Sequence, residues 1–198
     1  MESPQHAFDH HRYLVVPALV TGPLLGFLWR YIVERADAGY LRADEQVPDK
    51  RSAYADPVME HLLERVRPAI EDATGLRLFP TYSYVRVYRH GDALARHSDR
   101  PSCEISVSVN LGQEPPGTPG KSVPWPLWIA GPAGQTAVRL NPGDALLYRG
   151  IECEHWRDAF EGTRLAQVFL HYVDESGPHR EWRFDKRKSL GLTLPLPI

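Results

Sequence analysis

Three side chains of this sequence have the types and spacing of a metal site. His97 and Asp99 are separated by one residue, and a second histidine, His155, lies far along the chain. In an extended segment residues i and i+2 point to the same side, so His97 and Asp99 can reach one ion. Two histidines and a carboxylate hold Fe(II) on one face and leave its other positions open. The sequence therefore predicts an Fe(II) site whose third ligand, His155, comes from a neighbouring strand.

The His-x-Asp pattern is weak by itself, because His90-Gly91-Asp92 has the same spacing. Gly91 favours a tight turn there, and the side chains of a turn diverge. We therefore prefer the second pair, which lies past the turn on or beside the returning strand. Taken alone, His97 would be an ordinary surface or core histidine.

A segment just before this motif alternates with period two. Tyr82, Tyr84, Arg86 and Tyr88 share one face, and Ser83, Val85 and Val87 share the other. A polar, aromatic stripe suits a pocket better than a core, although the same pattern fits an outward polar face. We take the pocket interpretation, which makes Tyr84 and Arg86 candidate substrate contacts. Arg100, beside the metal motif, is a third candidate, and each arginine also fits a solvated surface position.

The elements that would position these residues are two helices followed by strands. A buried strand is expected over 13–19, then a helix capped by Thr21 that runs to about Ala38. A second helix is expected over 56–74, with Asp56 as its cap, Gly75 at its end and Pro68 kinking or splitting it.

The rest of the chain predicts mainly short strands. They are expected over 82–88, 103–111, 127–129, 136–140, 145–148 and 165–173, separated by turn signals. Such a pattern favours a β sandwich or barrel with helices packed on one side. The Pro/Gly-rich loop 113–126 is expected to be a lid or a mobile insertion. We expect one domain over 1–198, with helical support over about 21–75 and a β core over about 79–175.

Composition excludes several classes of protein. The chain has 198 residues, 42% of them hydrophobic and 24% charged, which is enough for a full core. A net charge of -2 gives no footprint for nucleic acid or an anionic membrane. The uncharged run 14–29 is short for a spanning helix and is broken by proline and glycine. Two cysteines, Cys103 and Cys153, allow at most one disulfide, so a cytoplasmic protein is expected. Nothing in the sequence sets an oligomeric state.

The chain resembles the prolyl 4-hydroxylase-like branch of the Fe(II)/2-oxoglutarate-dependent dioxygenases over 14–173. The resemblance rests on an ordered set of segments: Tyr88-Arg89-His90-Gly91-Asp92, Arg96-His97-Ser98-Asp99-Arg100, Pro142-Gly143-Asp144, His155-Trp156-Arg157, Gly162-Thr163-Arg164 and Gln167-Val168-Phe169-Leu170-His171-Tyr172. It implies a double-stranded β-helix, the jelly-roll core shared with cupins, with flanking helices.

The resemblance also implies roles for individual residues. His97, Asp99 and His155 would bind the catalytic Fe(II). Tyr88 would hydrogen-bond the carboxylate of 2-oxoglutarate, and Arg164 would form the salt bridge to its far end. A planar guanidinium suits a carboxylate partner, and Arg157 competes with Arg164 for this role.

The implied reaction uses O2 and 2-oxoglutarate to hydroxylate an unactivated C–H bond, with succinate and CO2 as coproducts. The substrate would be an amino acid, a peptidyl residue or a small natural product. Related halogenases replace the carboxylate ligand with a small residue, so the presence of Asp99 favours hydroxylation. Two alternatives stay open: a non-oxygenase, cupin-like metalloprotein and a degenerate β-barrel binding module.

Overall fold

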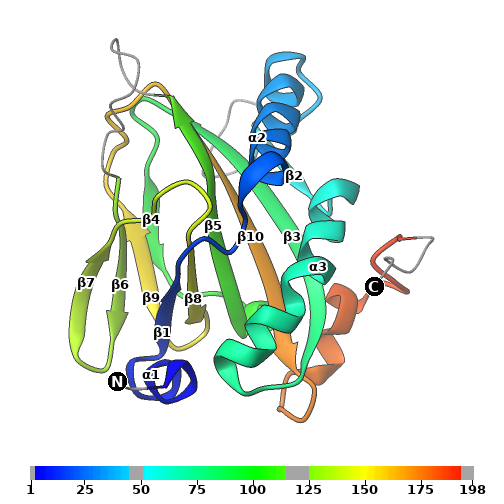
Figure 1. Cartoon of the computed structure of the whole chain (residues 1–198), viewed down its shortest axis with the longest axis vertical. Coiled ribbons are helices and arrows are strands. Elements are labelled where there is room, and N and C mark those ends of the chain that lie inside the picture. The colour runs from blue at the N-terminus through cyan, green and yellow to red at the C-terminus, as the bar shows by residue number, and fades with distance from the viewer. Residues whose placement is uncertain (1–2, 45–50, 115–124, 193–198) are drawn as a thin grey trace.

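The strands of the computed structural model form two antiparallel sheets (Figure 1). The structure describes residues 3–44, 51–114 and 125–192. The major sheet has six strands in the order β1 (Tyr13–Val16), β8 (Ala145–Arg149), β5 (Ile105–Glu114), β10 (Arg164–Asp174), β3 (Leu78–Arg89) and β2 (Ser52–Tyr54). The minor sheet has four strands in the order β4 (Leu94–His97), β9 (Glu154–Arg157), β6 (Leu127–Gly131) and β7 (Gly134–Val138). The predicted mainly β architecture with flanking helices is confirmed.

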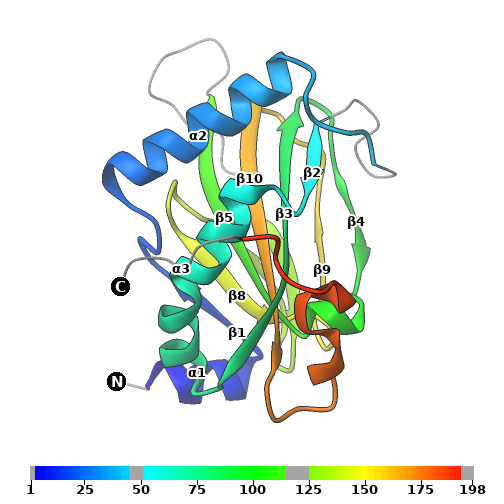
Figure 2. The ribbon, with the colours of Figure 1, turned by 90° about the vertical axis from the view of Figure 1, so that its right-hand side faces the viewer.

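Helices cover the outer face of the major sheet. They are α1 (Pro4–His11), α2 (Gly22–Asp37) and α3 (Pro57–Thr74), and Figure 2 shows α2 and α3 lying across β5, β10 and β3. Ile32 of α2 and Ile70 of α3 are fully buried, as are Val85 and Val87 of β3. The apolar stripes of the helices and the outward side chains of the sheet therefore make one core, which leaves the barrel interior to other residues.

The ends of α3 follow its sequence signals. The Asp56 carboxylate accepts hydrogen bonds from the backbone N–H groups of Val58 and Met59, and Gly75 ends the helix with φ +72°. The helix continues through Pro68, so Pro68 does not split it. Thr21 occupies the N-cap position of α2 but its side chain makes no capping hydrogen bond.

Several elements differ from the expected ones. The first strand ends at Val16, three residues short of 19, whereas β3 starts at Leu78 and takes in the apolar residues before Tyr82. Neither α1 nor β2 was expected. In α1 only Phe8 is buried, and β2 has three residues that are held by pairing with β3. Both elements therefore depend on contacts with distant parts of the chain.

Three further expectations concern loops, thiols and membranes. Residues 115–124 of the expected loop lie outside the described residues, and β5 takes the first two residues of that loop. Cys103 and Cys153 are both free and buried. Among the described helices, none is both long and apolar enough to cross a membrane.

Candidate functional site

The minor sheet and the loop after β4 bring the three predicted metal ligands together. His97 ends β4 and pairs in register with His155 of β9. Asp99 follows two residues later, and its backbone N–H donates to the carbonyl of Gly150 at 2.9 Å. Asp99 Oδ1 lies 3.8 Å from Nε2 of His97 and 3.8 Å from Nε2 of His155. The two histidines and the carboxylate therefore converge on one point.

Backbone carbonyls fix the orientation of both imidazoles. Nδ1 of His97 lies 2.8 Å from the carbonyl oxygen of Ala95, and Nδ1 of His155 lies 3.0 Å from that of Cys153. A carbonyl oxygen only accepts hydrogen bonds, so each neutral ring carries its proton on Nδ1. Each Nε2 then has a lone pair directed at the point where Asp99 Oδ1 lies.

This donor set fits a divalent metal ion. The ligand atoms of the three residues lie within 4.8 Å of one another. Burial lowers the pKa of His155, which keeps its ring in the neutral form that binds metals. The Tyr148 hydroxyl is a further polar group of the site, 3.4 Å from Nε2 of His155.

A cavity of about 200 Å³ opens onto the three ligands. Apart from the ligands it is lined by Tyr82, Tyr84, Arg86, Leu94, Tyr148, Phe169 and His171. Three of these come from the face of β3 that was interpreted as a pocket, and that interpretation is confirmed. The valines of the opposite face pack outward against the helices.

Both substrate candidates on β3 belong to this cavity. The Arg86 guanidinium lies 2.8 Å from Asp44 Oδ2, and the Tyr84 hydroxyl donates to the same oxygen at 2.5 Å. Arg86 also donates to the Tyr88 hydroxyl at 3.1 Å. Tyr88 is fully buried, and its ring packs edge-on against Trp125. The charge of Arg86 is therefore already matched by a carboxylate.

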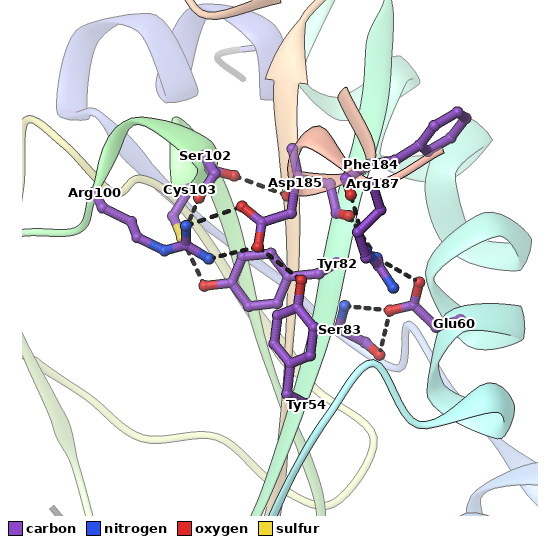
Figure 3. A network of polar contacts seen from close by, with 11 residues as sticks. Tyr54, Glu60, Tyr82, Ser83, Arg100, Ser102, Cys103, Phe184, Asp185 and Arg187 are labelled. Carbon is purple, nitrogen blue, oxygen red and sulfur yellow. Dashed lines mark hydrogen bonds and ion pairs between the residues drawn. The ribbon is translucent and has the colours of Figure 1, made fainter. Parts of the chain in front are cut away.

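Arg100, the third substrate candidate, does not line the cavity. Its guanidinium makes two hydrogen bonds of 2.9 Å to Asp185 and lies over the Tyr82 ring (Figure 3). Asp185 belongs to the C-terminal turn segment Arg180–Lys186, which packs beside β3. Arg100 therefore links the loop that carries Asp99 to this segment, and its contact with a substrate stays a prediction.

Arg164 lies on the wrong face of its strand for the expected role. Leu165 packs inside the barrel with Tyr88, and Ala166 packs outside against the helices, so Arg164 shares the outer face. Its guanidinium lies 2.7 Å from Asp37 at the end of α2 and 3.2 Å from Glu114. The prediction that Arg164 binds the far carboxylate of 2-oxoglutarate is corrected, because this guanidinium is bound to two carboxylates on the helix side.

Arg157, the competing candidate, does point into the barrel. It lies two residues after His155 on β9, so both side chains share the inner face of the strand. Its guanidinium donates to the Trp125 carbonyl at 2.6 Å and to Gln167 Oε1 at 2.8 Å. Gln167 in turn donates to the Ser108 hydroxyl.

The charge of Arg157 is matched by no carboxylate among the described residues. The side chain is buried, both of its hydrogen-bond acceptors are neutral, and its Nε has no partner among the described residues. Burial lowers the pKa of this guanidinium to about 10. A second cavity, of about 120 Å³, adjoins it and is lined also by Asn110, Trp125 and Gln167. The interior thus holds a buried cation beside space for an anion.

Sequence reasoning assigned no part in the site to the polar face of β5 or to His171. The Ser106 hydroxyl contacts both Asp99 and His171, and Ser108 and Asn110 share its inner face. Their signal was present, because these residues alternate with Ile105, Val107 and Val109 just as the tyrosines of β3 alternate with valines.

The fold of this chain is similar to that of several solved structures. No protein-family model and no curated protein matches the chain. Among solved structures, EctD from S. alaskensis with bound Fe superimposes with a TM-score of 0.70 at 18% identity, over 94% of this chain and 85% of that one. A Pseudomonas putida prolyl-4-hydroxylase gives 0.64 at 16% identity, over 84% and 96% of the two chains.

A third structure is the epimerase SnoN in complex with Fe3+, alpha ketoglutarate and nogalamycin RO. It gives a TM-score of 0.65 at 13% identity, over 85% of this chain and 81% of that one. Identities this low establish the fold alone. The chain therefore has the double-stranded β-helix fold of iron- and 2-oxoglutarate-dependent oxygenases.

Proposed function

We propose that this protein is an Fe(II)- and 2-oxoglutarate-dependent dioxygenase that hydroxylates an unactivated C–H bond. One observation carries the proposal: the Nε2 atoms of His97 and His155 and Oδ1 of Asp99 converge at a cavity inside a double-stranded β-helix. This donor set is typical of non-haem Fe(II) oxygenases. The prolyl 4-hydroxylase-like branch is the finer assignment, supported by the spacing from Tyr88 to His97.

Each of the three proposed ligands would contribute to iron binding in its own way. The imidazoles of His97 and His155 supply two neutral nitrogen donors whose orientation is fixed through Nδ1, and Asp99 supplies one negative charge. Iron bound there with 2-oxoglutarate would supply the oxidising power to insert oxygen from O2 into a C–H bond, leaving succinate and CO2. The walls of the cavity include the aromatic rings of Tyr82, Tyr84 and Phe169.

We infer that Arg157, rather than Arg164, binds the far carboxylate of 2-oxoglutarate. A molecule that contacts the metal ligands at one end and Arg157 at the other needs an acidic group at its far end. The guanidinium of Arg157 is buried beside neutral acceptors, so a carboxylate there would gain a charge-assisted pair in a dry site. Tyr88 remains a candidate partner, since its ring packs on Trp125, which lies under Arg157.

The lining of the cavity indicates the chemistry of the substrate. Tyr82, Tyr84 and Phe169 give it aromatic walls, and Arg86 with Asp44 gives it one ion pair. An amino acid, a peptidyl residue or a small natural product fits such a site. Asp99 keeps the carboxylate that halogenases lack, which supports hydroxylation as the outcome.

The test is an anaerobic titration of the metal-free protein with Fe(II) and then 2-oxoglutarate. A weak visible charge-transfer band is expected when both are bound, and His97→Ala should abolish it. Iron binding without the band would replace the proposal with a cupin-like metalloprotein. Binding of neither would replace it with a β-barrel binding module.

A further inference from the structure

The two carboxylate oxygens of Asp99 have different surroundings. Oδ1 faces the two histidines at 3.8 Å from each Nε2. Oδ2 points the other way, into the wall formed by β5 and the end of β8, where it accepts a hydrogen bond of 2.7 Å from the Ser106 hydroxyl. One oxygen is therefore directed at the candidate metal position, and the other is held by the protein.

Ser106 is itself fixed on a second side. It is fully buried on the inner face of β5, and its Oγ lies 2.9 Å from Nδ1 of His171. A serine hydroxyl has one proton to donate, and an ionised carboxylate can only accept. The Ser106 proton has two acceptors within reach, Asp99 Oδ2 at 2.7 Å and the Cys103 carbonyl oxygen at 3.1 Å. The carboxylate is the nearer and the stronger acceptor, so the proton goes mainly to Asp99, and the Nδ1–H of His171 donates to the Ser106 oxygen.

The backbone at Gly150 closes the remaining space around Oδ2. A Cβ atom at this position would lie 2.3 Å from Asp99 Oδ2, 2.3 Å from the Cys103 carbonyl oxygen and 2.8 Å from Ser106 Oγ. Only a residue without a side chain permits this approach. The carbonyl of Gly150 also accepts the backbone N–H of Asp99. The carboxylate is thus confined from two sides.

We propose that Ser106 is a positioning residue that retains Oδ2 and makes Asp99 a one-oxygen ligand. The inference rests on the metal site proposed above. If His97, Asp99 and His155 each gave one atom to the metal, positions on it would stay open for both donor atoms of a 2-oxo acid and one further small ligand. A carboxylate that turned to bind through both oxygens would occupy one of them. Ser106 therefore preserves the open position that an oxygenase needs.

The experiment uses Co(II) and the metal-free full chain, without 2-oxoglutarate or turnover. Ser106→Ala removes the hydroxyl, and Ser106→Cys replaces it with a weak donor while keeping the space filled. Ser108→Ala is the matched control, because Ser108 is equally buried on the same face of β5 but contacts Gln167 instead of Asp99. Circular dichroism and melting of each metal-free variant establish that it is folded.

Both Ser106 variants should bind Co(II) about 10- to 100-fold more weakly than wild type. Their visible Co(II) spectra should also change in intensity, reporting an altered coordination number. Ser108→Ala should keep the wild-type affinity and spectrum. Wild-type affinity and spectrum in a folded Ser106 variant would overturn the positioning role and leave the metal site standing. Failure of the wild-type chain to bind Co(II) would instead overturn the metal site, and the inference with it.

Discussion

Arg157 differs from Arg86, Arg100 and Arg164 in the charge of the groups that its guanidinium contacts. Arg86 is matched by Asp44, Arg100 by Asp185, and Arg164 by Asp37 and Glu114. Arg157 is buried and contacts only neutral acceptors among the described residues. A buried cation without a carboxylate costs free energy that a bound anion can recover.

Replacing this cation should therefore weaken binding of 2-oxoglutarate specifically. Arg157→Met should raise the dissociation constant of 2-oxoglutarate about 30-fold or more, the equivalent of about 2 kcal/mol for a buried charge pair. Fe(II) affinity should stay at the wild-type value, because the three ligands are intact. Calorimetry under anaerobic conditions measures both.

Arg164→Met is the matched control, since it removes the same group from the outer face of β10. It should leave the affinity for 2-oxoglutarate unchanged and lower stability slightly. The reverse result, with Arg164→Met weakening 2-oxoglutarate binding and Arg157→Met not, would restore the assignment expected from sequence spacing.

The two thiols should be unreactive in the folded protein. Burial raises the pKa of Cys103 to about 12 and that of Cys153 to about 11. The thiolate is the reactive form, so almost none is present at pH 8. A disulfide reagent should label neither cysteine in the native chain and both after unfolding, as counted by mass spectrometry. Rapid labelling of one thiol in the native chain would show that its burial is incomplete.

At the scale of elements, the C-terminal turn segment Arg180–Lys186 is held by side chains rather than by regular backbone structure. Phe184, Asp185 and Lys186 have φ values of 54°, 55° and 60°, a conformation that costs non-glycine residues free energy. Asp185 offsets this cost by accepting hydrogen bonds from Arg100 and Tyr54, and Arg187 pairs with the buried Glu60 (Figure 3).

Removing the charge of Asp185 should release this segment. Asp185→Asn should destabilise the protein by about 1 kcal/mol, a value that allows for the half-exposed Arg100, and lower Tm by about 2–4 °C. Backbone amides of the segment should exchange faster with deuterium. Glu181→Gln, an exposed acidic residue of the same segment, is the control. Equal exchange in both variants would mean that the ion pair does not hold the segment.

The same contact has a defined pH dependence. Burial by itself would raise the pKa of Asp185, but the hydrogen bonds from Arg100 and Tyr54 outweigh it and hold the pKa below its usual value. A carboxyl group with a depressed folded pKa contributes stability above its unfolded pKa of about 4 and loses it as the pH falls further. Release of the segment in wild type is therefore expected only below about pH 4.

Local patterns predicted the long elements, and they also predicted that His97, Asp99 and His155 lie close together. Strict alternation in 82–88 identified β3 and its pocket face, and Asp56 and Gly75 marked α3 at both ends. The spacing between motifs was a poorer guide to which arginine points into the barrel. Counting nine residues from His155 reached Arg164, but the face of a strand depends on the phase of the whole element, which Leu165 and Gln167 set. A short strand such as β4 forms mainly because β9 pairs with it, and no local pattern records that pairing.

For the whole molecule, the proposed metal ligands are separate from the main core. The core between the helices and the major sheet contains none of His97, Asp99 and His155. Removal of metal by a chelator should therefore leave the far-ultraviolet circular dichroism unchanged. Metal at 100 times its dissociation constant should stabilise the wild type by about 2.7 kcal/mol and raise Tm by about 5–10 °C. His155→Ala should show almost none of this rise, and loss of secondary structure in the chelated wild type would contradict the prediction.

The place of β10 at the middle of the major sheet constrains how the chain can fold during its synthesis. β10 follows all the other described strands along the chain, yet it lies between β3 and β5 and pairs with both along most of their length. A ribosome releases β3 and β5 long before their common neighbour, so each waits with an unpaired edge and an apolar face. Until residue 174 has emerged, β3 and β5 of the nascent chain lack the strand that pairs with both of them. Their free edges can then pair with a wrong strand. A chaperone that covers exposed strands would therefore act on β3 and β5 in the interval between translation of β5 and translation of β10.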